Sequence, residues 1–177
     1  LNTSVTVRQL LGHQSGYSNY TDEYMLQVAV AFQPTHIWTA FETISFCHQI
    51  NQPGAERRYS NTNYIMLGAI VEAVTGKPME QHYRERFFNP LHLNSMYLSV
   101  RESPNGHGEL VAPHDNISAF NPIFQLTGQP TFPDAYTNIS RFPMTAVASL
   151  AFSGGGIITN VRDMSEWGNA LFGGRAT

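Results

Sequence analysis

The chain has 177 residues, of which 42% are hydrophobic and only 13% are charged, and its net charge is −3. This length is typical of about one domain, and the hydrophobic share indicates a folded chain. The acidic balance, with nine Arg and a single Lys, argues against a nucleic-acid partner. No apolar run approaches the roughly 18 residues that span a bilayer, so we expect no membrane span.

The chain starts at Leu1 rather than Met and carries no signal peptide, which indicates a processed product or an excerpt of a longer protein. Low charge and scarce lysine favour export of the parent protein, to the periplasm or to the medium. No targeting signal within the chain supports this expectation directly.

The first 100 residues carry the start and stop signals of five helices. Thr6 with Gln9 and Thr39 with Glu42 form capping boxes, in which a hydroxyl at the N-cap faces a Gln or Glu three residues later. The boxes predict a first helix that stops at Gly12 and a third that extends to about residue 50. A second helix begins at residue 21 or 22, a fourth covers residues 62–75, and a fifth covers residues 78–89.

The fourth predicted helix is apolar on almost every side. Between Tyr64 and Val74 only Glu72 is charged, which predicts a buried helix. Gly68 would let a neighbouring element approach closely, and Gly76 is the expected C-cap.

Regular patterning is lost in residues 101–150, where prolines recur and neither helical nor strand periodicity persists. Aromatic residues in this stretch predict a long loop that packs on the domain rather than a disordered segment. Residues 151–177 follow with a Gly-rich strand or turn at 153–158 and a final helix that Asn160 caps. The chain is therefore expected to be mainly α, with a long irregular region and little sheet.

Tyr59 and Asn61 are the candidate catalytic residues. They stand two positions apart before the fourth helix, so in an extended segment the phenol and the amide point the same way. A phenol can carry a proton and an amide can hydrogen-bond a substrate peptide. The simpler explanation on the residues alone is that Ser60 or Asn61 caps the helix, and both interpretations stay open.

Four ordered blocks resemble the serine β-lactamase family, in the branch of class C β-lactamases, D-Ala-D-Ala peptidases and esterases. Residues 5–16 resemble the family's TVRxLLxHTSG segment, and residues 53–78 resemble its PGx4YSNx2YxLLGxIVExVTGKP segment. Residues 89–93 and 153–167 are similar to its xPLGM and xGGGxxSTxxDMxxW segments. Each block alone is modest, whereas four in the right order are specific.

The resemblance implies the helical domain of a β-lactamase-like α/β sandwich fold, and an acyl-transfer enzyme. It implies that Tyr59 is the proton carrier of a Tyr-x-Asn motif and that Asn61 contacts the substrate amide. The family's Ser-x-x-Lys and Lys-Thr-Gly or His-x-Gly motifs are absent, because the only lysine, Lys77, fits neither. We therefore expect residues 1–177 to be the helical portion of a penicillin-recognising serine hydrolase and to be inactive alone, with residues 1–100 as the helical core that holds the motif.

A non-catalytic binding or structural module that kept this scaffold is the alternative. The seven His show no paired metal-ligand spacing, so neither a metal nor a cofactor is expected. The expected partner of the full enzyme is a small-molecule or peptide substrate: a β-lactam, a D-Ala peptide or an ester. The surface that would face the missing sheet is expected to be apolar and exposed, which would promote self-association.

Overall fold

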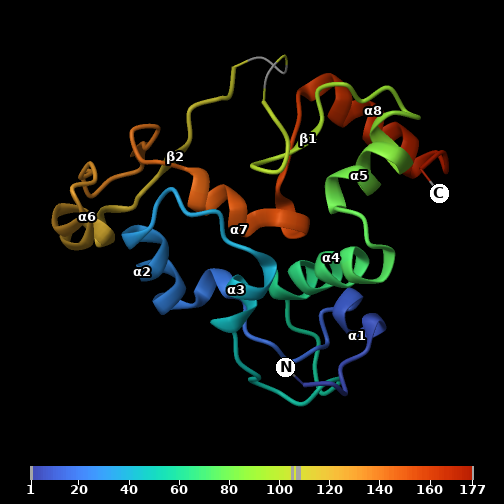
Figure 1. Cartoon of the computed structure of the whole chain (residues 1–177), viewed down its shortest axis with the longest axis horizontal. Coiled ribbons are helices and arrows are strands. Elements are labelled where there is room, and N and C mark those ends of the chain that lie inside the picture. The colour runs from blue at the N-terminus through green and yellow to red at the C-terminus, as the bar shows by residue number, and fades with distance from the viewer. Residues whose placement is uncertain (1, 105, 107–108, 177) are drawn as a thin grey trace.

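The computed structural model describes residues 2–104, 106 and 109–176 and is mainly helical with little sheet (Figure 1). None of the helices in this described part is both long and apolar enough to cross a membrane. The first half of the chain contains α1 (Val7–Leu11), η1 (Tyr20–Asp22), α2 (Tyr24–Phe32), α3 (Ala40–Ser45), α4 (Thr62–Thr75), α5 (Met79–Tyr83) and the π-helical turn η2 (Arg84–Phe88). The second half contains β1 (Tyr97–Leu98), β2 (His114–Asp115), η3 (Ser118–Phe120), α6 (Asn121–Thr127), β3 (Thr137–Asn138), α7 (Thr145–Gly155), β4 (Ile157–Ile158) and α8 (Val161–Phe172).

Local capping signals define three helix starts as the sequence predicts. Both capping boxes form, at Thr6 before α1 and at Thr39 before α3. Asn160 caps α8, since its Oδ1 accepts a 2.9 Å hydrogen bond from the Asp163 backbone N–H. Gly76 ends α4 in the left-handed conformation, with φ 66°. Such signals act within one helical turn and are readable without tertiary context.

Helix α3 ends at Ser45, so the expected extension to residue 50 is wrong. The residues beyond it pair with the segment after α1 instead. Gln49 forms a bridge with Tyr17, and the Ile50 N–H donates to the Gly16 carbonyl at 2.8 Å. These backbone bonds to a distant segment replace those of a continued helix.

The stretch 101–150 holds more regular structure than its sequence predicts. Helix α6 lies inside it with Pro122 in its first turn, where proline is tolerated because that N–H has no helical partner. Helix α7 begins at Thr145 and includes the first glycines of the segment predicted as a turn or strand. The aromatic packing is as predicted for Phe124, Phe132 and Phe142, which are buried together.

Two short antiparallel strand pairs are the sheet structure of the described residues. β1 pairs with β4, with Tyr97 opposite Ile158, and so joins the chain after η2 to the start of α8. β2 pairs with β3, with His114 opposite Asn138, and closes the segment that carries α6 (Figure 1).

Helix α4 packs against α7 at the centre of the molecule (Figure 1). A methyl group added at Gly68 would lie 2.1 Å from the Ser153 Oγ and 2.8 Å from the ring of Phe152, so only glycine fits this contact. Helix α4 is not covered on every side, however. Ile65 and Met66 are buried, whereas Val74 is 80% exposed, so the expectation of a wholly buried helix is wrong for this chain.

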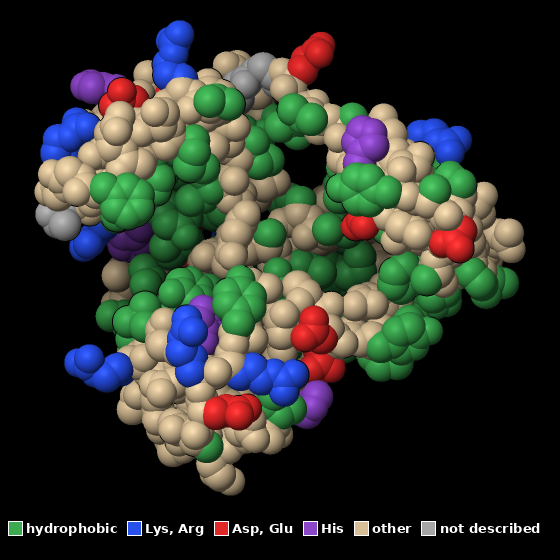
Figure 2. Space-filling view, turned by 180° about the vertical axis from the view of Figure 1, so that it is seen from behind, with side chains coloured by type: hydrophobic (Ala, Val, Ile, Leu, Met, Phe, Trp, Pro, Cys, Tyr) green, Lys and Arg blue, Asp and Glu red, His purple; other side chains and the backbone are tan. Residues whose placement is uncertain are grey.

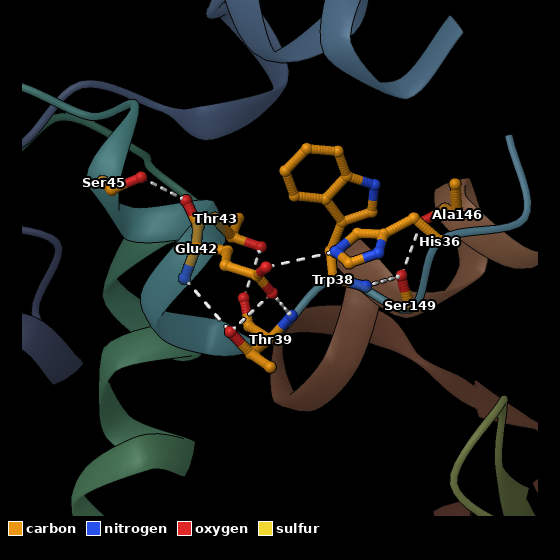
Figure 3. A network of polar contacts seen from close by, with 8 residues as sticks. All are labelled: His36, Trp38, Thr39, Glu42, Thr43, Ser45, Ala146 and Ser149. Carbon is orange, nitrogen blue, oxygen red and sulfur yellow. Dashed lines mark hydrogen bonds and ion pairs between the residues drawn. The ribbon is translucent and has the colours of Figure 1, made fainter. Parts of the chain in front are cut away.

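The entrance of α3 is held to α7 by a chain of polar contacts (Figure 3). The Trp38 N–H donates to the Ser149 Oγ at 2.9 Å, and that hydroxyl donates to the Ala146 carbonyl at 2.7 Å. On the α3 side, Glu42 accepts from the Thr39 N–H at 2.8 Å and contacts His36 Nε2 at 3.1 Å. The Thr39 N–H, more than any other group, holds the pKa of the Glu42 carboxyl below its usual range.

Gly68→Ala is expected to lower the free energy of unfolding by about 1–3 kcal/mol, because its methyl group would force α4 and α7 apart. Urea denaturation would measure the change. Gly168→Ala is the matched control, since Gly168 lies in α8 with open space around it. That variant should gain about 0.5–1 kcal/mol from helix propensity. Equal effects of the two substitutions would contradict the tight contact.

Candidate functional site

Tyr59 and Asn61 project together from the segment that enters α4. The Tyr59 hydroxyl donates to the Asn61 Oδ1 at 2.6 Å, so the two side chains lie on the same side, as the two-residue spacing predicts. Tyr59 is 63% exposed, and no described residue accepts from the Asn61 side-chain N–H groups. The pair therefore presents a phenol and an amide donor to the solvent.

The residues that follow each of them, Ser60 and Thr62, point inward and anchor the segment. The Ser60 Oγ and the Thr62 Oγ1 both donate to the carbonyl of Ser18, at 3.0 and 2.8 Å. The Thr62 Oγ1 also accepts from the Tyr20 N–H at 2.9 Å. Ser60 and Thr62 are fully buried, so these contacts fix which side of the segment faces out.

The capping interpretation of Asn61 gains no support from its contacts. Asn61 occupies the N-cap position of α4, but its side chain caps no N–H and its backbone is already helical, at φ −61° and ψ −27°. Its own N–H donates to the Asn19 Oδ1 at 2.9 Å. The side chain is thus free of a structural role in the helix and bonds Tyr59 instead.

A trio of side chains that sequence reasoning missed lies beneath the pair, with Ser15 and Asn63 buried and His13 half-buried. Asn63 is 1% exposed, its Oδ1 accepts from the Ser15 hydroxyl, and its Nδ2 donates to His13 Nδ1 at 3.2 Å. Because that ring nitrogen accepts, the neutral imidazole carries its proton on Nε2. The His13 ring contacts the Tyr59 ring in a tilted arrangement, with 4.7 Å between the ring centroids.

His13 also closes the turn after α1, because its N–H donates to the Leu10 carbonyl at 3.1 Å. Its backbone is left-handed, at φ 54°, and its ring lies against the rings of Tyr59 and Tyr64. A usable signal was present in the sequence, because His13 and Ser15 lie in one family-like block and Asn63 lies in another, residues 53–78. Which side chains meet across 48 or 50 residues is set by the tertiary fold.

Ser153 and Lys77, whose side chains could in principle take part in catalysis, are held in structural contacts away from the pair. The Ser153 hydroxyl donates to the Tyr64 carbonyl at 2.7 Å and serves the α4–α7 contact. Lys77 follows the C-cap of α4, about 20 Å along the helix from Asn61, and its Nζ is held by Glu85 at 2.9 Å. Among the described residues, no group of three or more His, Cys, Asp or Glu could hold a metal ion.

The site is thus a rigidly anchored helix entrance that displays one phenol and one amide. The family model for Beta-lactamase matches residues 2–177. The chain belongs to the beta-lactamase family, in agreement with the resemblance of its four sequence blocks.

Two solved structures share this fold at 27% sequence identity. D-amino acid amidase from Ochrobactrum anthropi SV3, complexed with D-phenylalanine, matches with a TM-score of 0.75 over 99% of this chain and 47% of its own. D-stereospecific amidohydrolase from Streptomyces sp. matches with a TM-score of 0.72 over 97% of this chain and 48% of its own.

Curated relatives are matched over smaller shares of their length. The unguisins hydrolase ungD' of Aspergillus campestris is 21% identical over 171 residues, which are 95% of this chain and 28% of the relative. A putative D-alanyl-D-alanine carboxypeptidase of Escherichia coli K12 is 31% identical over 90 residues, 51% of this chain and 21% of the relative. The chain therefore spans less than half of the length of each of these proteins.

Asn63→Ala is expected to cost about 1–3 kcal/mol of unfolding free energy, because it leaves the buried Ser15 hydroxyl without its acceptor. Asn61→Ala is the matched control, two residues away, and should cost under about 0.5 kcal/mol because its side chain bonds only the exposed Tyr59. Urea midpoints of the two variants would measure the difference. A larger loss for Asn61→Ala would contradict the division into an anchoring and a displayed asparagine.

Proposed function

We propose that the chain is the helical portion of a beta-lactamase-like serine hydrolase and that it supplies Tyr59 and Asn61 to the active site. The observation that carries this is the hydrogen-bonded pair of a phenol and an amide on a segment whose neighbouring residues, Ser60 and Thr62, are buried and hydrogen-bonded. A group that must meet a substrate needs exposure together with a fixed position, and this segment combines the two.

In the proposed reaction, a serine hydroxyl attacks the carbonyl of the substrate amide, the C–N bond breaks and the amine leaves as a covalent ester forms, and water then hydrolyses the ester to release the acid. Tyr59 is the proton carrier between the nucleophile and the leaving group. The Asn61 side-chain N–H groups donate to the substrate carbonyl, since its Oδ1 already accepts from Tyr59. Backbone N–H groups would hold the oxyanion, and no metal or cofactor takes part.

The nucleophile is proposed to come from residues of the parent protein outside these 177. The sequence holds no Ser-x-x-Lys, and its single lysine is paired with Glu85 at the far end of α4. Taken alone, the chain would therefore bind substrate but lack the nucleophile that forms the covalent acyl-enzyme.

The proposed substrates are small amides or peptides. The other substrate classes that the family resemblance leaves open are β-lactams and esters. Names among the similar proteins support amide bonds beside a D-amino acid: a D-amino acid amidase, a D-stereospecific amidohydrolase and a D-alanyl-D-alanine carboxypeptidase. Another relative, from Bacillus subtilis, is named N-acetylmuramyl-L-alanine amidase. These names also support an exported parent protein that works at the cell envelope.

The uncovered side of α4 is proposed to be the face that the rest of the parent fold covers. Apolar side chains of α1, α3 and α4 line a groove there, and Ile70 belongs both to it and to a second groove toward α5. An apolar face of this kind promotes contact between copies when its cover is absent.

The 177-residue chain is accordingly expected to associate as its concentration rises, measured by sedimentation velocity. Ile70→Asp should weaken the association, because it places a charge in the centre of the apolar face. Val161→Asp is the matched control on exposed α8 and should leave the association unchanged. A chain that stays monomeric at every concentration would contradict this proposal.

The catalytic proposal is tested in the parent protein with Tyr59→Phe, which should lower kcat/KM for amide substrates by about 10²–10⁴ because proton transfer is lost. Tyr24→Phe is the matched control, since Tyr24 is equally exposed on α2. Labelling with a fluorescent penicillin or a fluorophosphonate should modify the parent protein but not the 177-residue chain.

Labelling of the 177-residue chain itself would contradict an external nucleophile. Full activity of Tyr59→Phe would remove Tyr59 from the mechanism. A parent protein without acyl transfer would favour the alternative, a binding module that kept the scaffold alone.

A further inference from the structure

The imidazole of His13 is bonded to the segment that carries Tyr59. Its Nδ1 accepts from the backbone N–H of Ser60 at 3.4 Å and from the Asn63 Nδ2 at 3.2 Å. The His13 carbonyl accepts from the N–H of Arg58 at 2.9 Å, so His13 bonds the chain on both sides of Tyr59. The ring is therefore fixed to the candidate site, although Ser60 lies 47 residues further along the chain.

Ring contacts continue from this fixed imidazole to Tyr59. The centroid of the His13 ring lies 4.7 Å from that of Tyr59 and 5.2 Å from that of Tyr64, and both pairs are tilted. Because Tyr64 belongs to α4, the helix supports the imidazole in addition to the bonds at Nδ1. In the lower part of Figure 2, histidine and hydrophobic side chains meet at the surface beside basic ones. Ring pairs at such distances attract each other beyond the area that they bury.

The Tyr59 side chain has little else to hold it. It is 63% exposed, and its hydroxyl is bonded to Asn61, which is itself a displayed side chain. Among the described residues, His13 is the one whose ring contacts the ring of Tyr59. An exposed side chain without such a contact exchanges between rotamers, and each rotamer carries the phenol oxygen to a different place. The position of that oxygen therefore depends on the His13 ring.

We propose that His13 is the positioning residue of the proton carrier: its ring keeps Tyr59 in the rotamer from which the phenol transfers a proton. This inference rests on the proposed function and adds to it a residue that acts through Tyr59, without touching substrate itself. A misplacement of about 1 Å in a catalytic group can cost on the order of a hundredfold in rate, so one ring contact is enough to matter.

His13→Asn separates the ring from the hydrogen bonds. The Oδ1 of an asparagine lies as many bonds from Cα as Nδ1 does, so it can accept from the Ser60 N–H and the Asn63 Nδ2. Asparagine also tolerates the left-handed backbone of residue 13, at φ 54°. The urea midpoint of this variant should therefore stay close to that of the wild type, while the ring contact with Tyr59 is lost.

His13→Phe is the complementary change. It keeps a ring beside Tyr59 but leaves the Ser60 N–H and the Asn63 Nδ2 without their acceptor, so its urea midpoint should fall. The two variants thus place loss of the ring and loss of the hydrogen bonds in different proteins.

The order of the Tyr59 ring can be measured by NMR in the 177-residue chain with labelled tyrosine, and Tyr59→Phe assigns its signals. Side-chain couplings should show one rotamer in the wild type and in His13→Phe, and averaging between rotamers in His13→Asn. His92→Asn is the matched control, because His92 is exposed and has the same left-handed backbone, at φ 55°. That variant should leave the Tyr59 signals unchanged.

In the parent protein, His13→Asn should lower kcat for amide substrates about 10–100-fold, because the phenol is displaced from its place in the transition state. KM should stay within about threefold, because Asn61 still meets the substrate. His13→Phe should retain more of kcat than His13→Asn. A purely structural His13 predicts the opposite order, since His13→Phe is the variant that loses the hydrogen bonds.

A Tyr59 ring that is as ordered in His13→Asn as in the wild type would overturn the inference. So would a kcat that His13→Asn leaves unchanged while Tyr59→Phe abolishes acyl transfer, and this result would leave the proposed function standing. An unchanged kcat in Tyr59→Phe would instead refute the catalytic proposal, whatever the order of the ring in His13→Asn.

Discussion

The carbonyl oxygen of Ser18 is the acceptor on which the geometry of the candidate site depends. Two hydroxyls, from Ser60 and Thr62, donate to this one atom from a fully buried position. Fixing these two side chains inward holds the segment in the position from which Tyr59 and Asn61 project together. A buried hydroxyl without a partner costs roughly 1–3 kcal/mol, so a one-residue slip of the segment is strongly disfavoured.

The same interaction makes the site a product of two distant parts of the chain. Ser18 lies in the connection between α1 and α2, and the donors lie at the entrance of α4. The trio of His13, Ser15 and Asn63 repeats this arrangement one layer below, with a second set of bonds between the same two segments. Helix α4 in turn packs closely against α7, because Gly68 has no side chain to keep Ser153 and Phe152 away. A displacement of α4 would therefore change the position of Tyr59 and Asn61 directly.

What the sequence predicts well is what local chemistry decides. The capping boxes at Thr6 and Thr39 and the cap at Asn160 act within a single turn, and each helix starts where its cap predicts. The end of α3 was missed because residues beyond Ser45 pair with the segment at Gly16, a competition that no local pattern reveals. Helices α6 and α7 were missed for a related reason, since proline in a first turn and glycines at a helix end read as loop signals out of context.

For the candidate site, the two-residue spacing was enough to predict that Tyr59 and Asn61 share a side, and nothing more. It could not tell an anchoring asparagine from a displayed one, because Asn61 and Asn63 are chemically identical and both lie at the start of α4. Their difference is one of burial: Asn63 is enclosed by residues 48 and 50 positions away, whereas Asn61 faces outward. The identity of the side chain thus sets which chemistry is available. Long-range hydrogen bonds then decide which of the two asparagines is free to offer its amide to a substrate.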